Sequence, residues 1–124
     1  MDFKTELPIY LQVMTHIKRD IITGVIHPGA KLPSVRDLAL QYTINPNTAS
    51  RVYRELEAEN ICFTRRGMGT FVTEDTERIN RMKRETAQEL IQQFMEGMAH
   101  LGFTCDETMN LIEKSLTKDK KEGE

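Results

Sequence analysis

The stretch that decides the fold is Ile44-Asn45-Pro46-Asn47-Thr48-Ala49-Ser50-Arg51-Val52-Tyr53-Arg54-Glu55-Leu56-Glu57. It predicts a helix with a clear beginning. Asn45 can accept a hydrogen bond from the backbone of the first turn, and Pro46 suits the first helical position. Apolar residues at three- and four-residue spacing give this helix one face that we expect to be buried: Ala49, Val52, Tyr53 and Leu56.

The opposite face of this helix carries small hydrogen-bonding groups and cations: Asn47, Thr48, Ser50, Arg51 and Arg54. Amides, hydroxyls and guanidinium groups in the first turns suit the base edges of the DNA major groove. Many amphipathic helices carry similar residues on a merely solvated face. The surrounding sequence therefore has to separate the two interpretations.

The composition predicts one small domain with an appendage. The chain has 124 residues, 39% of them hydrophobic, and no Trp, which favours a helical core. We expect a cytoplasmic protein, because no long apolar run and no charged-then-apolar leader is present. Cys62 and Cys105 form no C-x-x-C motif, so we expect reduced thiols, no metal site and no cofactor.

Charge is distributed unevenly along the chain. The net charge is −2, yet residues 1–73 hold nine Lys or Arg against seven Asp or Glu, a balance of +2. Residues 74–124 hold eight basic and twelve acidic residues, a balance of −4. This split indicates a DNA-facing front and an acidic rear.

Two further helices are expected before the central one. Tyr10, Val13, Met14, Ile17 and Ile21 form an apolar stripe at helical spacing, and Gly24 is a plausible stop. Ser34 is the expected cap of a second helix, with Asp37 three residues later. The short interval at 43–44 makes the second and third helices a helix-turn-helix pair.

A β-hairpin is predicted after the central helix. Ile61, Phe63, Phe71 and Val72 belong to two short strands, and Arg65-Arg66-Gly67-Met68-Gly69 lies between them. Gly67 and Gly69 supply the positive backbone angles of a hairpin tip. The two arginines can reach a phosphate or the minor groove, although edge charges that prevent aggregation would give the same pattern.

Residues 8–72 resemble the winged helix-turn-helix domain of the GntR family of bacterial transcription regulators. The matching residues are Pro8-Ile9-Tyr10, Gly24, Pro28-Gly29, Leu32-Pro33-Ser34-Val35-Arg36, Leu38-Ala39, Asn45-Pro46-Asn47-Thr48, Arg51, Tyr53, Leu56-Glu57 and Gly67-x-Gly69-Thr70-Phe71-Val72. The resemblance implies a mainly α fold with a small hairpin wing. Pro46 departs from the pattern, because many members carry an Arg in the first turn of this helix. The Asn-Pro-Asn-Thr form resembles the short YtrA-like branch.

The resemblance also implies operator contacts from the second helix, the third helix and the wing. Together with the polar face described above, they give this predicted DNA-binding set: Ser34, Arg36, Asn45, Asn47, Thr48, Ser50, Arg51, Arg54, Arg65, Arg66 and Gly67.

Residues 74–124 are expected to form a separate dimerisation segment of two helices, behind a winged domain of residues 1–73. A helix from about Asp75 to Leu101 would be followed by one capped by Thr104 and Glu107. Their apolar stripes predict a homodimer interface consisting of Ile79, Met82, Leu90, Phe94, Met98, Met109, Ile112 and Leu116. Packing within one chain would be the alternative. The methionines would also let such a surface adapt to a small-molecule effector, which the sequence does not identify.

The sequence therefore predicts a homodimeric repressor that binds double-stranded DNA at a palindromic operator. A non-specific architectural DNA binder would need a larger basic excess. A protein-interaction module would need an apolar patch on the exposed face of the third helix. No enzyme is expected, since the sequence shows no nucleophile–base pair, phosphate loop or paired carboxylates.

Overall fold

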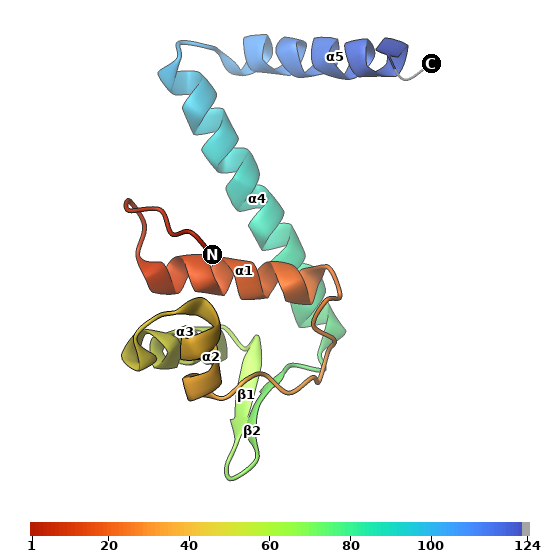
Figure 1. Ribbon diagram of the computed structural model, residues 1–124. Coiled ribbons are helices and arrows are strands. Elements are labelled where there is room, and N and C mark those ends of the chain that lie inside the picture. Colours follow the sequence, from red (N-terminus) through yellow and green to blue (C-terminus); the bar gives the residue numbers. More distant parts are fainter. Residues whose placement is uncertain (123–124) are drawn as a thin grey trace. The chain divides into compact units, whose positions relative to one another are not determined.

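Five helices and one two-stranded hairpin follow one another along the chain in the computed structural model, which describes residues 1–122 and side chains as far as Lys118. The elements are α1 (Ile9–Ile22), α2 (Val35–Tyr42), α3 (Pro46–Ala58), β1 (Cys62–Arg65), β2 (Gly69–Val72), α4 (Thr76–His100) and α5 (Cys105–Glu122) (Figure 1). The chain divides into a winged unit, Met1–Lys83, and a C-terminal unit that begins at Arg84.

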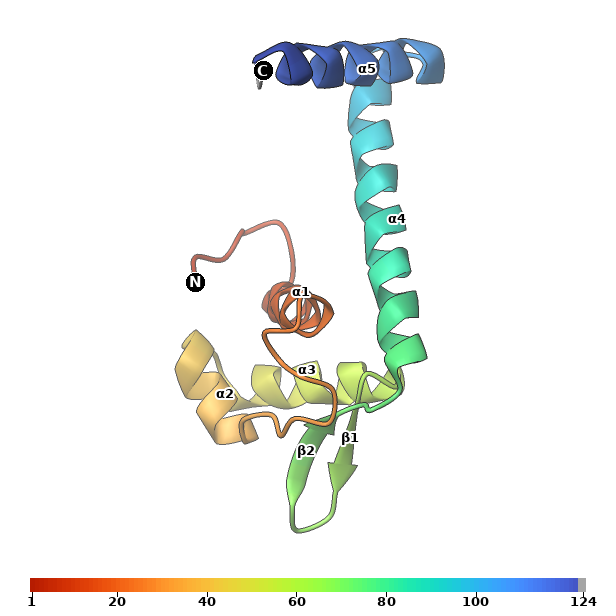
Figure 2. The ribbon, with the colours of Figure 1, turned by 90° about the vertical axis from the view of Figure 1, so that its right-hand side faces the viewer.

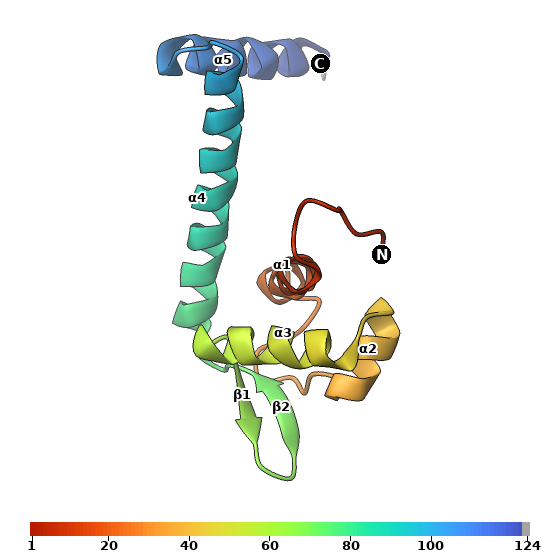
Figure 3. The same ribbon diagram turned by 90° about the vertical axis from the view of Figure 1, so that its left-hand side faces the viewer.

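The core of the winged unit lies between α1, α2 and α3. Figures 2 and 3 view α1 nearly end-on, and it lies across α3 in both views. The predicted apolar stripes of α1 and α3 meet in one cluster with residues from α2, the hairpin and the start of α4. An ion pair of 3.0 Å between Lys18 Nζ and Glu59 Oε1 also ties α1 to the C-terminal end of α3.

The caps that the sequence predicts are formed. Ser34 Oγ accepts a hydrogen bond from the Asp37 backbone N–H at 3.1 Å, and Asn45 Oδ1 accepts one from the Asn47 N–H at 2.7 Å. Thr43 connects α2 to α3 in a left-handed conformation, with φ of 54°. The helix-turn-helix pair is therefore confirmed.

The hairpin pairs β1 and β2 antiparallel, with Phe63 opposite Phe71 and Arg65 opposite Gly69. Its tip is Arg66-Gly67-Met68, and Gly67 takes the expected positive φ of 77°. Lys31 forms an isolated antiparallel bridge to Phe71, so the chain just before Leu32 lies beside β2. Arg65 is the last residue of β1 and pairs with Gly69, so it does not lie between the strands as predicted.

The winged unit extends ten residues beyond the predicted boundary at 73/74. Ile79 and Met82, on the first turns of α4, are buried in its core cluster, and the Arg78 Nε donates to the Glu59 carbonyl at 2.8 Å. The periodicity predicted an interface stripe from Ile79 onward, but the first two members already have a partner within the chain. We therefore withdraw Ile79 and Met82 from the predicted dimer interface.

The C-terminal unit contains the rest of α4 and all of α5. Gly102, with φ of 91°, lies between the two helices. Thr104 and Glu107 form a reciprocal capping box, each backbone N–H donating to the other side chain at 3.1 Å. The bounds of α4 agree with the predicted helix to within one residue at each end, and α5 begins directly after its predicted cap at Thr104.

Candidate nucleic-acid interface

The first turns of α3 carry most of the predicted base-reading side chains. Asn45 Oδ1 is used by the cap, so this residue fixes where the helix begins. Asn47, Arg51 and Arg54 are exposed, whereas Thr48 and Ser50 are half-buried. The helix thus separates a buried apolar face from an accessible polar one.

Four of these side chains share one open hollow of about 410 Å³ on the surface. Asn47, Thr48, Arg51 and Arg54 line it together with Ile9 and Tyr10 of α1. Ser50 does not line it. Because the hollow combines an amide, a hydroxyl and two guanidinium groups, it presents both donors and acceptors to a nucleic acid.

Arg51 is held against the protein surface. Its guanidinium carbon lies 3.8 Å from the centroid of the Tyr10 ring, within the range of a cation–π interaction. Its Nε lies 3.9 Å from Glu55 Oε1 one turn further along α3. The sequence did not indicate Ile9 and Tyr10 as part of this surface, since Tyr10 was assigned only to the apolar stripe of the first helix.

The N-terminus of α2 provides a second polar surface. Arg36 is exposed in the first turn, and the Ser34 hydroxyl caps the helix. The Tyr53 hydroxyl of α3 donates to the Pro33 carbonyl at 2.5 Å, which anchors this N-terminus to α3. Burial raises the pKa of Tyr53, so its hydroxyl remains a donor.

The wing carries a stacked pair of aromatic rings beneath a cation. The Phe63 and Phe71 centroids are 5.9 Å apart, and the Arg65 guanidinium carbon lies 5.3 and 5.7 Å from their centroids. Arg66, in contrast, is exposed at the tip beside Gly67. The rings therefore restrict Arg65, while Arg66 extends freely into solvent.

Lys31 belongs to the same face of the wing and was also missed. It pairs with Phe71, and a Cβ added to Gly69 would lie 2.9 Å from Lys31 Cε. The lysine stem thus runs past Gly69, where the positive φ of 119°, not the space, favours glycine. The bridge joins positions forty residues apart, so no local pattern around Lys31 indicates it.

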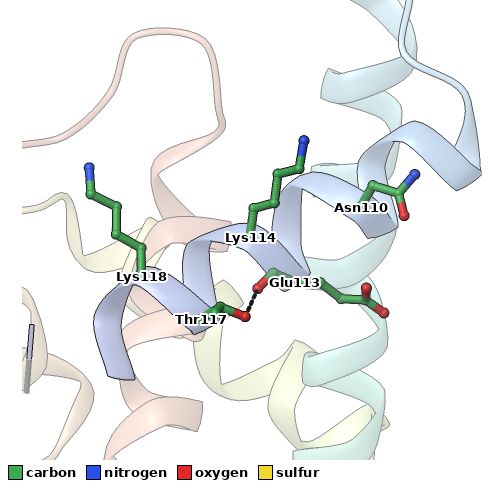
Figure 4. A pocket seen from close by; sticks show the side chains of 5 residues that line it. All are labelled: Asn110, Glu113, Lys114, Thr117 and Lys118. Carbon is green, nitrogen blue, oxygen red and sulfur yellow. Dashed lines mark hydrogen bonds between the residues drawn. The ribbon is translucent and has the colours of Figure 1, made fainter. Parts of the chain in front are cut away.

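A second hollow, of about 510 Å³, lies along α5 in the C-terminal unit. Its lining residues all come from this one helix: Asn110, Glu113, Lys114, Thr117 and Lys118 (Figure 4). The Thr117 hydroxyl donates to the Glu113 carbonyl at 2.9 Å. The described lining is thus a polar strip on the surface of α5, with no apolar residue in it.

Other kinds of site find little support in the described part of the chain. No helix there combines the length and apolar character needed to cross a membrane. Among the same residues, no three His, Cys, Asp or Glu side chains gather closely enough to hold a metal ion. Cys62 is buried, and burial raises the pKa of its thiol to about 12.

These features define a winged helix-turn-helix protein whose third helix offers a polar, cationic face. Comparison with known proteins agrees. Residues 9–72 match the model of the bacterial regulatory proteins of the gntR family. The chain belongs to the GntR family of bacterial regulatory proteins and is a DNA-binding transcription regulator.

One relative matches nearly the whole chain, and another matches a little over half of it. The chain is 40% identical over 116 residues to the uncharacterized HTH-type transcriptional regulator YhcF of Bacillus subtilis, covering 94% of this chain and 95% of that one. It is 45% identical over 75 residues to the HTH-type transcriptional repressor YtrA of Bacillus subtilis, covering 60% and 58%. The relationship to YtrA agrees with the branch predicted from Asn-Pro-Asn-Thr.

Solved structures give the same result. A GntR family transcriptional regulator from Listeria monocytogenes superposes with a TM-score of 0.80 at 38% identity, covering 90% of this chain and 98% of the other. The predicted fold, a winged helix-turn-helix domain followed by two helices, is therefore confirmed.

Proposed function

We propose that this chain is a cytoplasmic homodimeric repressor that binds a palindromic operator, with α3 in the major groove and the wing against the adjacent backbone. The observation that carries the proposal is the shared hollow of Asn47, Thr48, Arg51 and Arg54. These side chains hydrogen-bond to base edges without rearrangement of the buried face of α3.

The remaining predicted contacts are assigned to the DNA backbone. Arg36 at the start of α2 and Arg65 and Arg66 on the wing supply positive charge, and the N-terminus of α2 adds its own positive dipole. Lys31 joins this group because its stem runs along the wing past Gly69. Such contacts fix the register of the protein on the duplex.

The dimer rests on the C-terminal unit. Leu90, Phe94 and Leu116 are 61%, 47% and 60% exposed, although all are large and apolar. Of the other predicted residues, Met98 and Ile112 are half-buried and Met109 is exposed. Three residues that the sequence did not indicate add further exposed apolar surface: Ile91, Leu101 and Leu111. Covering five such side chains with a second copy stabilises by about 1.5–3 kcal/mol each, enough to offset an association cost of several kcal/mol.

The experiment is selection of duplexes from a randomised DNA pool by the full-length protein. We expect an enriched palindrome whose half-sites lie about one helical turn, ~34 Å, or a multiple of it apart. Enrichment of no sequence would indicate an architectural DNA binder. Absence of any DNA binding would leave the winged unit as a protein-interaction module.

Substitution of Arg51 then tests base reading. Arg51→Ala should weaken binding to the selected duplex by about 1–3 kcal/mol and relax preference at one base position. The matched control is Arg19→Ala, because Arg19 is an exposed arginine of α1 that does not line the hollow. Equal weakening on all sequences would make Arg51 a phosphate contact.

A further inference from the structure

The contact between Tyr10 and Arg51 joins the first turn of α1 to α3 across forty-one positions of sequence. The guanidinium lies over the ring at 3.8 Å, and both residues line the same hollow. Two side chains from different helices thus meet at the surface proposed to face DNA.

Tyr10 is well placed to act as a fixed platform. It is half-buried and packs against the core cluster, and Val13, Met14 and Ile17 on the following turns of α1 are fully embedded. Arg51 is a long side chain with much conformational freedom to lose. A ring packed against the core removes part of that freedom before any ligand arrives.

Stacking on a guanidinium face leaves its hydrogen-bonding edge accessible. The five N–H donors lie in the plane of the group, whereas the cation–π contact uses the face. The separation of 3.9 Å between Arg51 Nε and Glu55 exceeds a hydrogen bond. The two terminal nitrogens therefore remain available for a bidentate contact with a guanine edge.

We propose that Tyr10 is a specificity-determining positioning residue, whose ring holds the Arg51 guanidinium in the orientation that reads one base pair. This inference rests on the proposed base-reading role of Arg51. It assigns to α1 a direct part in sequence discrimination, in addition to its part in the core.

The test uses full-length protein and the duplex that wild type selects from a random pool, with a scrambled duplex as comparison. Tyr10→Ala should weaken binding to the selected duplex about 3- to 10-fold and relax the same base position as Arg51→Ala. Tyr10→Phe keeps the ring and should bind like wild type. Tyr10→Leu keeps apolar bulk without an aromatic face, so it should lose the same affinity as Tyr10→Ala. It is the variant to use if alanine destabilises the fold.

A double-mutant cycle separates positioning from general structure. Once Arg51 is alanine, removing the Tyr10 ring should cost no further affinity, because the two residues act as one unit. Salt dependence should be the same for wild type and Tyr10→Leu, since no phosphate contact is lost. Thermal unfolding of each variant verifies that the winged unit is folded.

Several results would overturn the inference. Loss of affinity in Tyr10→Phe would make the hydroxyl, not the ring, the important group. Tighter binding by Tyr10→Leu would mean that the ring holds Arg51 away from DNA. If Arg51→Ala relaxes one base position and Tyr10→Leu does not, only this inference fails. If neither does, the base-reading role of Arg51 fails, and the inference falls with it.

Discussion

The winged unit and the C-terminal unit treat their apolar residues in opposite ways. In the winged unit, helix stripes and hairpin close on one another, and Val13, Val52 and Leu56 lose all contact with solvent. Between Arg84 and Lys118, the described side chains include a single buried one, Thr108. The apolar residues there are half-buried or exposed.

The difference teaches that helical periodicity specifies which face of a helix is apolar but not what that face packs against. The same three- and four-residue spacing runs from Ile79 to Met98 along α4. Its first members complete the core of their own unit, while Leu90 and Phe94 face solvent. An exposed apolar stripe of this length on a folded protein marks an interaction surface.

The largest expected effect comes from replacing one leucine in each region with alanine and comparing the loss of stability. Leu56→Ala should destabilise the winged unit by about 2–5 kcal/mol, because it leaves a cavity in a closed core. Leu90→Ala should change that stability by less than about 0.5 kcal/mol. All three tyrosines lie in the winged unit, so urea unfolding followed by tyrosine fluorescence reports on this unit. Equal effects of both substitutions would remove the distinction.

The two regions should also differ in how much their positive charges contribute to DNA binding. Neutralising Arg36, Arg65 or Arg66 with alanine should reduce the slope of log affinity against log salt by roughly one unit each. The control is Lys114→Ala on the polar strip of α5, which should leave the slope unchanged. Fluorescence anisotropy at several salt concentrations measures it, and three unchanged slopes would contradict the assignment of backbone contacts.

A smaller expected difference between the two units is the reactivity of their cysteines. At neutral pH a thiol reagent should modify the exposed Cys105 in the native protein and reach the buried Cys62 only after unfolding. Reaction of two thiols per native chain would place Cys62 outside the core.

The same thiol predicts a pH dependence. Burial raises the pKa of Cys62 from 9.0 to about 12. Between these values the unfolded chain has released a proton that the folded chain retains. The contribution of this thiol to the stability of the winged unit should therefore be constant below about pH 9 and fall as the pH rises above it. Urea unfolding across this range measures the effect, and Cys62→Ala should lessen the fall.

Local chemistry is the part of this molecule that the sequence predicts well. The caps at Ser34, Asn45 and Thr104 and the positive angle at Gly67 depend on residues within a few positions of one another. The polar face of α3 follows from the same periodicity that identifies its buried face. These features needed no knowledge of the fold beyond the helix itself.

Contacts between distant segments are the part that the sequence does not predict. Tyr10 over Arg51 and Lys31 beside Phe71 each join residues that are about forty positions apart. The division between core and interface along α4 likewise depends on where the helix meets the winged unit. In each case the residue types were visible, but their partners were set by packing in three dimensions.

The central claim is that the exposed stripe of the C-terminal unit joins two copies of the chain. Sedimentation of Phe94→Asp tests it most directly, because the substitution places an unpaired charge in the proposed interface. Gln92→Asp adds the same charge two positions earlier, on the other side of α4. Wild type and Gln92→Asp should sediment as dimers at micromolar concentration, and Phe94→Asp as a folded monomer that retains only half-site binding. A wild-type monomer, or a Phe94→Asp dimer, would contradict the account.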